Sequence, residues 1–446
     1  MGPLQKFVSQ FLLCLSLAVL VADCLDAQQA AAPSPSGPVR LTLEDALQRA
    51  RQNSVTFQAA VTDARLAYED KKQATAALLP SVNYNNSVIY TQGTGVDKQV
   101  RFIANNAVQE YISQGNVHEA LDVAGFAEAR RAAAIAAAAR ARQEIASRGL
   151  VVTVVESYYA AAAAQKKLNA AQGAADEGER FLELTQNLEH GGEVAHSDVI
   201  KAELQVNERR RQLQEAKLLL LNARLDLAVL IFPDFNDNFE QADDLHANPV
   251  LPAFPEIETS AARNNPEIRA ALETTNAAEH GVLVARAGYL PSLSLDYFYG
   301  IDATHFATRT DGVSNLGSSA VATLNIPIWN WGATQSKVRQ AELQRDQAKR
   351  ELSFTQRKLL AELRSLYAEA QTASDELSNL DRSAHLGEES LRLTTLRYQN
   401  GESTVLEVVD AQNTATISKA AYEDGALRYR VALANLQTLT GVLTTP

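Results

Sequence analysis

Cysteine, basic charge and long apolar runs are all scarce in this sequence. Its 446 residues include two cysteines, Cys14 and Cys24, and the formal net charge is −12. This charge, together with the lack of Lys/Arg runs, excludes a nucleic-acid partner, because phosphate binding needs a basic surface. After residue 27, no apolar run approaches the length of about 18 residues that a membrane-spanning helix needs.

Catalytic and metal-binding motifs are also missing. The sequence holds no GxSxG, HExxH or phosphate-binding loop, so we expect neither an enzyme nor a cofactor. A metal site can be drawn from His190, Glu193 and His196, but these residues coincide with a turn that tolerates polar side chains. The segment from Asp234 is similar to the start of a calcium loop, yet Phe239 replaces the required glycine. We therefore predict no bound metal.

Residues 1–27 predict an export signal. Lys6 supplies the positive start, residues 7–21 form an apolar stretch too short to span a bilayer, and a cleavage site ends at Ala27. Cleavage there removes both cysteines, so the mature chain has no thiol or disulfide. Lipidation of Cys24 is the alternative, although the residue before it is acidic rather than small. The strand patterns must decide whether the exported chain is soluble or crosses a membrane as strands.

A flexible linker over residues 28–40, rich in proline and small residues, precedes the first helical pattern. The pattern predicts a helix with Thr42 as its N-cap that continues to Leu79, where Pro80 ends it because proline cannot donate to the helix. The next segment alternates with the period of a strand. Its apolar face is formed by Val82, Tyr84, Val88 and Tyr90.

A long helical hairpin follows. Helical spacing over residues 118–188 predicts a helix roughly 100 Å long, which a single globular core cannot hold. Gly191 and Gly192 supply the left-handed turn that ends it, and a second helix covers residues 197–231. An acidic connector over residues 232–253 comes next.

The whole pattern is then repeated at a period of about 210 residues. "LTLEDALQRARQNS" matches "EIETSAARNNPEI", "LLPS" matches "YLPS", and the tip "HGGEVAHSDVIKAE" matches "NGESTVLEVVDAQ". We place the two repeats at residues 41–231 and 254–440, with a tail at residues 441–446. Each repeat orders its elements as helix, two strands, long helix, tip and helix, so the chain should have four strands and two long hairpins.

The strand patterns are those of a sheet that faces lipid. Apolar rows form one face of the strands in the second repeat, and they consist of Leu293, Leu295, Tyr297 and Tyr299, and of Ala320, Ala322, Leu324, Ile326 and Ile328. About ten residues per strand suits a membrane strand, although the segment 103–113 alternates poorly. Aromatic side chains near the strand ends favour the headgroup level, and these are Tyr84, Tyr90, Tyr297, Trp329 and Trp331.

Four strands cannot close a barrel whose known minimum is about eight. A lipid-facing sheet must have no unpaired edge, because each orphan amide in hydrocarbon costs several kcal/mol. The sequence therefore predicts an α+β membrane protein in which several copies close one β-barrel in outer-membrane lipid, and in which the long helices continue its wall.

The duplicated openings, the "LLPS" and "YLPS" junctions, "NIPIWNWG" and "RYQNGESTVLEVVDAQ" resemble the TolC family of outer-membrane efflux proteins. The resemblance covers the mature chain nearly end to end. It implies a homotrimer with a twelve-stranded outer-membrane β-barrel, continued by a periplasmic α-helical barrel of antiparallel coiled hairpins. It also implies an exit duct for efflux or type I secretion, coupled to an inner-membrane transporter through a periplasmic adaptor (membrane fusion) protein.

The same resemblance assigns a channel aperture to the hairpin tips. It places Glu407 and Asp410 in an acidic ring that attracts cations, with three copies giving six carboxylates. In the first repeat Asp198 matches Glu407, but Lys201 stands at the position of Asp410, so its charge partly neutralises the mouth. Tyr398 is an expected constriction residue. An arginine that ties the mouth shut in the family is replaced by Ser403.

The tip turns themselves are expected to contact the adaptor, and they comprise Gly191, Gly192, Gly401, Glu402 and Ser403. For the acidic residues of the ring, the alternative is that they are solvated charges on an exposed helix. For the whole chain, the alternative is a soluble periplasmic coiled-coil protein that scaffolds or binds partners, with the alternating segments as small sheets.

Overall fold

The computed structural model describes residues 39–90, 109–233, 239–242, 245–247 and 249–441. The export signal, the linker up to residue 38, Cys24, Asp234 and the tail beyond residue 441 lie outside the described residues. The chain divides into two compact units. In the small unit, β1 (Val39–Leu41) pairs in parallel with β4 (Phe239–Gln241), so the last residues of the expected linker form a strand.

The large unit begins with the elements of the first repeat. They are α2 (Leu43–Asn53), α3 (Val55–Ala76), β2 (Ser81–Tyr90), β3 (Gln109–Leu121), α4 (Val123–His190) and α5 (His196–Ile231). The prediction of one continuous helix up to Leu79 is wrong, because Ser54 leaves helical geometry and its hydroxyl accepts a hydrogen bond from the Phe57 amide at 3.3 Å. Pro80 lies just beyond the end of α3, as predicted.

The second repeat has the same order of elements. They are α6 (Phe254–Asn264), α7 (Pro266–Ala287), β5 (Ser292–Ala303), β8 (Leu316–Asn325), α8 (Ala333–Gln399) and α9 (Val405–Thr440), with a small ladder of β6 (Arg309–Thr310) and β7 (Val313–Ser314) between β5 and β8. Asn265 caps α7 through the Ile268 amide at 2.9 Å, as Ser54 caps α3. The duplicated order of elements that the sequence predicts is therefore present.

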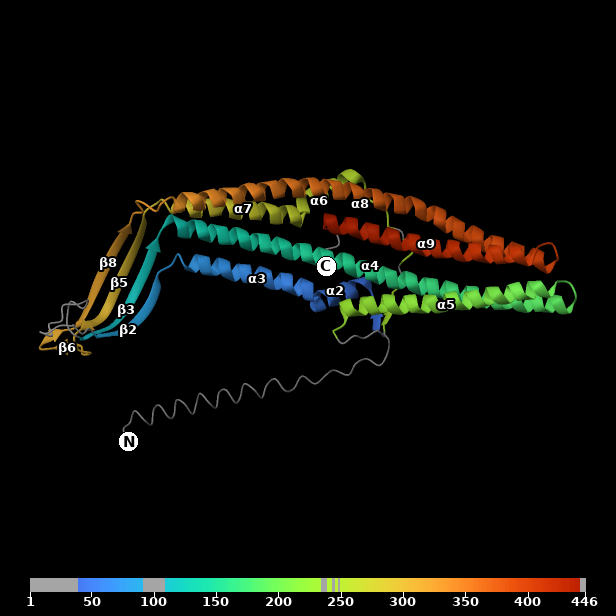
Figure 1. Cartoon of the computed structure of the whole chain (residues 1–446), viewed down its shortest axis with the longest axis horizontal. Coiled ribbons are helices and arrows are strands. Elements are labelled where there is room, and N and C mark those ends of the chain that lie inside the picture. Colours follow the sequence, from blue (N-terminus) through green and yellow to red (C-terminus); the bar gives the residue numbers. More distant parts are fainter. Residues whose placement is uncertain (1–38, 91–108, 234–238, 243–244, 248, 442–446) are drawn as a thin grey trace, which may run out of the picture. The chain divides into compact units, whose positions relative to one another are not determined.

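Two very long helices organise the large unit. α4 has 68 residues and α8 has 67, so each is about 100 Å long. Figure 1 shows α3 and α5 following one another along α4, while α7 and α9 follow one another along α8. The two repeats are joined because α4 also packs against α7 and α9. No helix in the described part of the chain is long and apolar enough to cross a membrane.

The strands lie partly at other positions than predicted. β3 covers Gln109–Leu121, so residues 118–121 are strand rather than helix, and residues 103–108 lie outside the described residues. β8 ends at Asn325, so Ile326 and Ile328 lie beyond the strand. The ladder ends at the Ser292–Asn325 pair, and Pro291 and Pro327 lie just beyond it on the two strands, where neither has an amide hydrogen to donate.

The four long strands form one antiparallel sheet in the order β2-β3-β5-β8. Its register confirms the predicted two-faced pattern, since Val82 opposes Val117, which opposes Tyr297, which opposes Ala320. The opposite face carries polar groups, and His118 lies 2.8 Å from Asp296 there. Among the described strands, β2 and β8 each have one unpaired edge.

Candidate functional site

The first hairpin tip is a tight turn between α4 and α5. Gly192 has φ of +77°, and its amide donates to the Glu189 carbonyl at 2.8 Å while the Glu193 amide donates to the Leu188 carbonyl at 2.9 Å. These two bonds and the left-handed residue define a Schellman motif. Gly191 keeps right-handed geometry, so Gly192 alone provides the left-handed residue of the predicted turn.

The second tip, between α8 and α9, has the same geometry. Gly401 has φ of +71°, its amide donates to the Tyr398 carbonyl at 3.0 Å, and the Glu402 amide donates to the Arg397 carbonyl at 2.8 Å. Arg397 also reaches over the turn, because its Nη2 donates to the Glu402 carbonyl at 3.0 Å. This arginine was not predicted from the sequence, although its place one turn before the tip glycine is a signal of such a contact.

The two tips differ in the charges that follow the turn. On α5, Lys201 donates to the Asp198 carboxylate at 3.1 Å. On α9, the equivalent Glu407 accepts hydrogen bonds from Ser403 at 2.8 Å and from Thr404 at 3.2 Å. The first tip therefore holds a neutralised pair at the positions where the second tip holds two acids.

Glu407 and Asp410 are both exposed on α9, three residues apart, and so lie on one side of the helix. The hydrogen bond from Ser403 holds the pKa of Glu407 below its usual range, with smaller contributions from Thr404 and from Arg397, whose Nη1 lies 3.9 Å away. Glu407 is thus kept ionised at neutral pH, which is the state that attracts cations.

Tyr398 lies apart from these acids. Its side chain is only 4% exposed, and its ring centroid lies 5.2 Å from that of Phe181 on α4. We call the buried residues around it the tip cluster, and they are Phe181, Ala202, Tyr398, Val405 and Val408. Burial raises the pKa of the Tyr398 phenol, which lies 3.5 Å from Thr185. Within the chain, Tyr398 therefore packs the two hairpins together.

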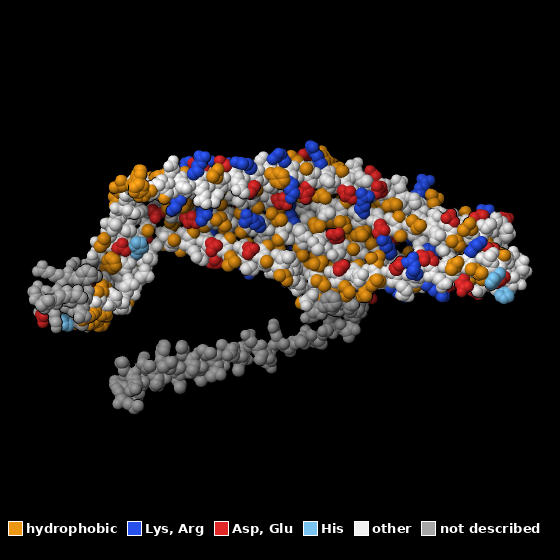
Figure 2. All heavy atoms as spheres, in the orientation of Figure 1, with side chains coloured by type: hydrophobic (Ala, Val, Ile, Leu, Met, Phe, Trp, Pro, Cys, Tyr) orange, Lys and Arg blue, Asp and Glu red, His pale blue; other side chains and the backbone are white. Residues whose placement is uncertain are grey.

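The predicted interface aromatics lie either on the apolar face of the sheet or in the segment that follows β8. Tyr84, Tyr90, Tyr297 and Trp331 are exposed, and Trp331 is 89% exposed with φ of +56°. Its ring centroid lies 5.8 Å from that of Trp329. Figure 2 shows hydrophobic side chains gathered where α8 begins, and the exposed apolar residues of this segment are Ile326, Ile328, Trp329 and Trp331.

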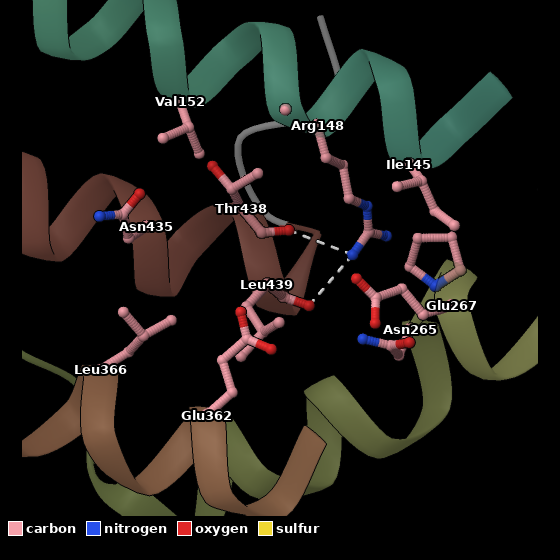
Figure 3. A pocket seen from close by; sticks show the side chains of 12 residues that line it. Ile145, Arg148, Val152, Asn265, Glu267, Glu362, Leu366, Asn435, Thr438 and Leu439 are labelled. Atoms are coloured by element: carbon pink, nitrogen blue, oxygen red, sulfur yellow. Dashed lines mark hydrogen bonds between the residues drawn. The ribbon is translucent and has the colours of Figure 1, made fainter. Parts of the chain in front are cut away.

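Midway along the helices, Arg148 joins elements from both repeats. It lies on α4 and donates from Nη1 to the carbonyls of Thr438 at 3.1 Å and Leu439 at 3.0 Å, at the end of α9 (Figure 3). Its Nη2 donates to the Asn264 carbonyl and the Glu144 carboxylate, both at 2.8 Å. A cavity of about 400 Å³ lies beside it. Because the terminal carbonyls of α6 and α9 lack partners within their own helices, Arg148 stabilises both ends.

The histidines of the first tip do not converge on one point. Nδ1 of His190 donates to the Gln186 carbonyl at 2.7 Å, and Nδ1 of His196 lies 2.7 Å from the Glu189 carboxylate. Among the described residues there is no group of three or more side chains that could hold a metal ion.

Comparisons with known proteins agree with this architecture. The model of the outer membrane efflux protein family matches residues 46–231 and 259–442. The outer membrane protein OprJ of Pseudomonas aeruginosa is 24% identical over 76% of this chain. The match spans 65% of OprJ, which is just under two thirds of its length.

Two further proteins are similar over most of the chain. The proteases secretion protein PrtF of Dickeya chrysanthemi is 24% identical over 90% of this chain and 88% of its own length. The crystal structure of the CmeC outer membrane channel of Campylobacter jejuni aligns with a TM-score of 0.78 at 18% identity, over 93% of this chain and 90% of that chain. At this identity, the likeness to CmeC supports the fold alone.

Proposed function

We propose a function from one premise, which is that the chain belongs to the outer membrane efflux protein family. The protein acts as the outer-membrane channel of a tripartite efflux or type I secretion system. It is a passive exit duct, which means that the chain provides the passage and other components of the system drive the transport. PrtF is named for protease secretion and CmeC as an outer-membrane channel, and both names agree with this role.

One observation carries the proposal, namely the open four-stranded sheet with one apolar face. The apolar row continues across all four strands, from Val82 through Val117 and Tyr297 to Ala320. In hydrocarbon, the unpaired edges of β2 and β8 cost several kcal/mol for each orphan backbone group. Pairing β2 of one copy with β8 of the next satisfies both edges, and three copies give a closed barrel of twelve strands.

The helical part continues this wall into the periplasm. Alanine is frequent along α4, and many of its alanines are buried, which allows close lateral contact between helices. In the trimer, the two hairpin tips of each copy would meet at the end that faces away from the membrane. There they form the aperture and contact the periplasmic adaptor, which links the duct to an inner-membrane transporter.

Charge at the tips gives the aperture its selectivity. Glu407 and Asp410 from three copies place six carboxylates around one opening, which raises the local concentration of cations. The Asp198–Lys201 pairs of the first tips add no net charge. At these two positions the aperture is therefore acidic on one hairpin of each copy and charge-balanced on the other.

Conductance of the purified protein in planar bilayers tests the proposal. We expect discrete, cation-selective channels, and heat-modifiable trimers in the outer-membrane fraction. The double variant Glu407→Gln, Asp410→Asn should insert and conduct with a reduced cation preference. A monomer or dimer in the soluble periplasmic extract, without pore activity, would overturn the duct and support a soluble scaffold instead. Unchanged selectivity in the double variant would contradict only the acidic ring.

A further inference from the structure

A small cavity lies between the two hairpins, on the tip side of Arg148. It measures about 120 Å³ and is lined by side chains from α4, α5, α8 and α9. Its charged and amide side chains are Glu177, Arg209, Glu388, Gln412 and Lys419. Since a water molecule takes about 30 Å³ in the liquid, the cavity has room for a halide ion together with water.

Arg209 contributes a buried positive charge without a counter-charge. The residue is 2% exposed. Its Nη1 donates to Oε1 of Gln212 and its Nη2 to Oδ1 of Asn413, both at 2.9 Å. With the Gln205 amide in its better-satisfied orientation, its oxygen also accepts from Nη2 at 3.0 Å and from Nε at 3.2 Å. All three acceptors are neutral amides, and within the described residues no carboxylate lies at ion-pair distance from Arg209. Burial lowers the pKa of its guanidinium, which is the direction expected for a desolvated cation.

Gln412 contributes an amide without a partner. The residue is 3% exposed on α9, and neither its nitrogen nor its oxygen has a hydrogen-bond partner in the described part of the protein. A buried amide that is left unpaired destabilises the folded state, so an arrangement that keeps one usually satisfies it with a bound molecule.

The other charges around the cavity compensate one another. Glu177 pairs with Arg180 at 2.6 Å, and Glu388 pairs with Lys419 at 3.0 Å. Arg209 is therefore the uncompensated charge of the set. An anion would accept hydrogen bonds from the Gln412 amide N–H groups and supply the negative charge that Arg209 lacks. The unpartnered Gln412 Oε1 needs a donor, which a water molecule beside the anion would supply.

We propose that this cavity binds a small monovalent anion of the size of chloride, held by the guanidinium of Arg209 and the side-chain amide of Gln412. Because Arg209 lies on α5 and Gln412 on α9, the bound anion links the first hairpin to the second. The site does not depend on passage of a substrate through a duct, so the inference goes beyond the proposed function.

Bromide provides the test, because it scatters anomalously and replaces chloride. Crystals of the full chain grown in bromide should give an anomalous peak in the cavity, at hydrogen-bond distance from both Arg209 and Gln412. The melting temperature should also be higher in bromide or chloride than in gluconate at equal ionic strength, since a ligand that binds only the folded state stabilises it. Density without anomalous signal, which indicates water, would overturn the proposal.

Two variants separate this site from general salt effects. Gln412→Glu places a carboxylate beside Arg209, so it should remove the bromide peak and the halide dependence of melting. Arg210→Gln is the matched control, because Arg210 is exposed and pairs with Glu179 at 2.7 Å, and it should keep both. A bromide peak that persists in Gln412→Glu contradicts the proposed ligands. The diffraction result on the unaltered protein decides the question even if Gln412→Glu does not fold.

Discussion

Lys201 and Asp198 form an ion pair at 3.1 Å on α5, one turn after the first hairpin tip. The same two positions on α9 carry two acids, Glu407 and Asp410, and the cation nearest to Glu407 is Arg397 on α8, at 3.9 Å. The two repeats thus share the backbone of their tips but differ in the charge that they present. This asymmetry makes the contribution of each tip to an aperture separable by mutation.

Lys201→Gln should increase cation selectivity. The substitution leaves Asp198 without its partner, so each chain presents one more uncompensated carboxylate at the tip. Stability should change little, because an exposed ion pair contributes about 0.2 to 1 kcal/mol. Reversal potentials in planar bilayers measure the selectivity. Lys217→Gln is the control, since Lys217 lies farther along α5 by roughly 24 Å, well beyond the Debye length. Equal shifts in both variants would contradict a local effect of Lys201.

Ser403→Ala should move the pH dependence of selectivity upward. Because the Ser403 hydroxyl lowers the pKa of Glu407, the carboxylate stays charged above that depressed pKa and is neutralised as the pH falls through it. Without the hydroxyl the pKa rises, so cation preference should be lost at a higher pH.

Titration of the reversal potential from neutral to acidic pH measures this shift. Ser197→Ala on the first tip is the control, because its hydroxyl makes no described bond to a carboxylate, and its profile should coincide with that of the parent. Coincident profiles for Ser403→Ala and the parent would show that Glu407 does not set the selectivity.

Gly192→Ala and Gly401→Ala should each destabilise the protein by about 1 to 2 kcal/mol, because both glycines have left-handed geometry that a Cβ disfavours. The space around them is open, so the cost comes from the backbone alone. Gly149→Ala is the matched control, since Gly149 lies inside α4 with equally open surroundings. This variant should be more stable than the parent by about 0.5 to 1 kcal/mol, because alanine is favoured over glycine inside a helix. The melting temperature should fall in Gly192→Ala and Gly401→Ala and rise in Gly149→Ala. The same change in all three variants would contradict the assigned turns.

Local sequence rules predicted much of this fold. Pro80 and the tip glycines mark the ends of elements, and alternation identifies three of the four strands. β3 alternates poorly because Ser113 and Gly115 lie on the apolar face, where the Ser113 hydroxyl is paired with Tyr84 at 2.8 Å and Asn86 at 2.7 Å. Its limits therefore depend on pairing with β2 and β5, which a single segment does not reveal.

The site was predicted less completely, because its contacts join distant residues. The Asp198–Lys201 pair follows from helical spacing, and both residues were named from the sequence. Arg148 was missed because its partners lie 290 and 291 positions away. Tyr398 was named as a constriction residue by resemblance, while the structure buries it in the tip cluster. The burial of Tyr398 depends on which helix packs against α8, and the local sequence pattern does not determine that packing.

Tyr398→Ala distinguishes packing from constriction. If the ring holds the hairpins together, its removal leaves a cavity beside Phe181 and should cost about 3 to 5 kcal/mol, with a matching fall in melting temperature. Tyr398→Phe is the matched control, because it keeps the ring and loses only the contact with Thr185 at 3.5 Å, so it should melt like the parent. Because its hairpins are held together less tightly, the alanine variant should show a higher conductance as well as a lower melting temperature. An alanine variant that conducts more but melts like the parent would instead place Tyr398 at the opening, because a side chain that only narrows a passage contributes little to folding.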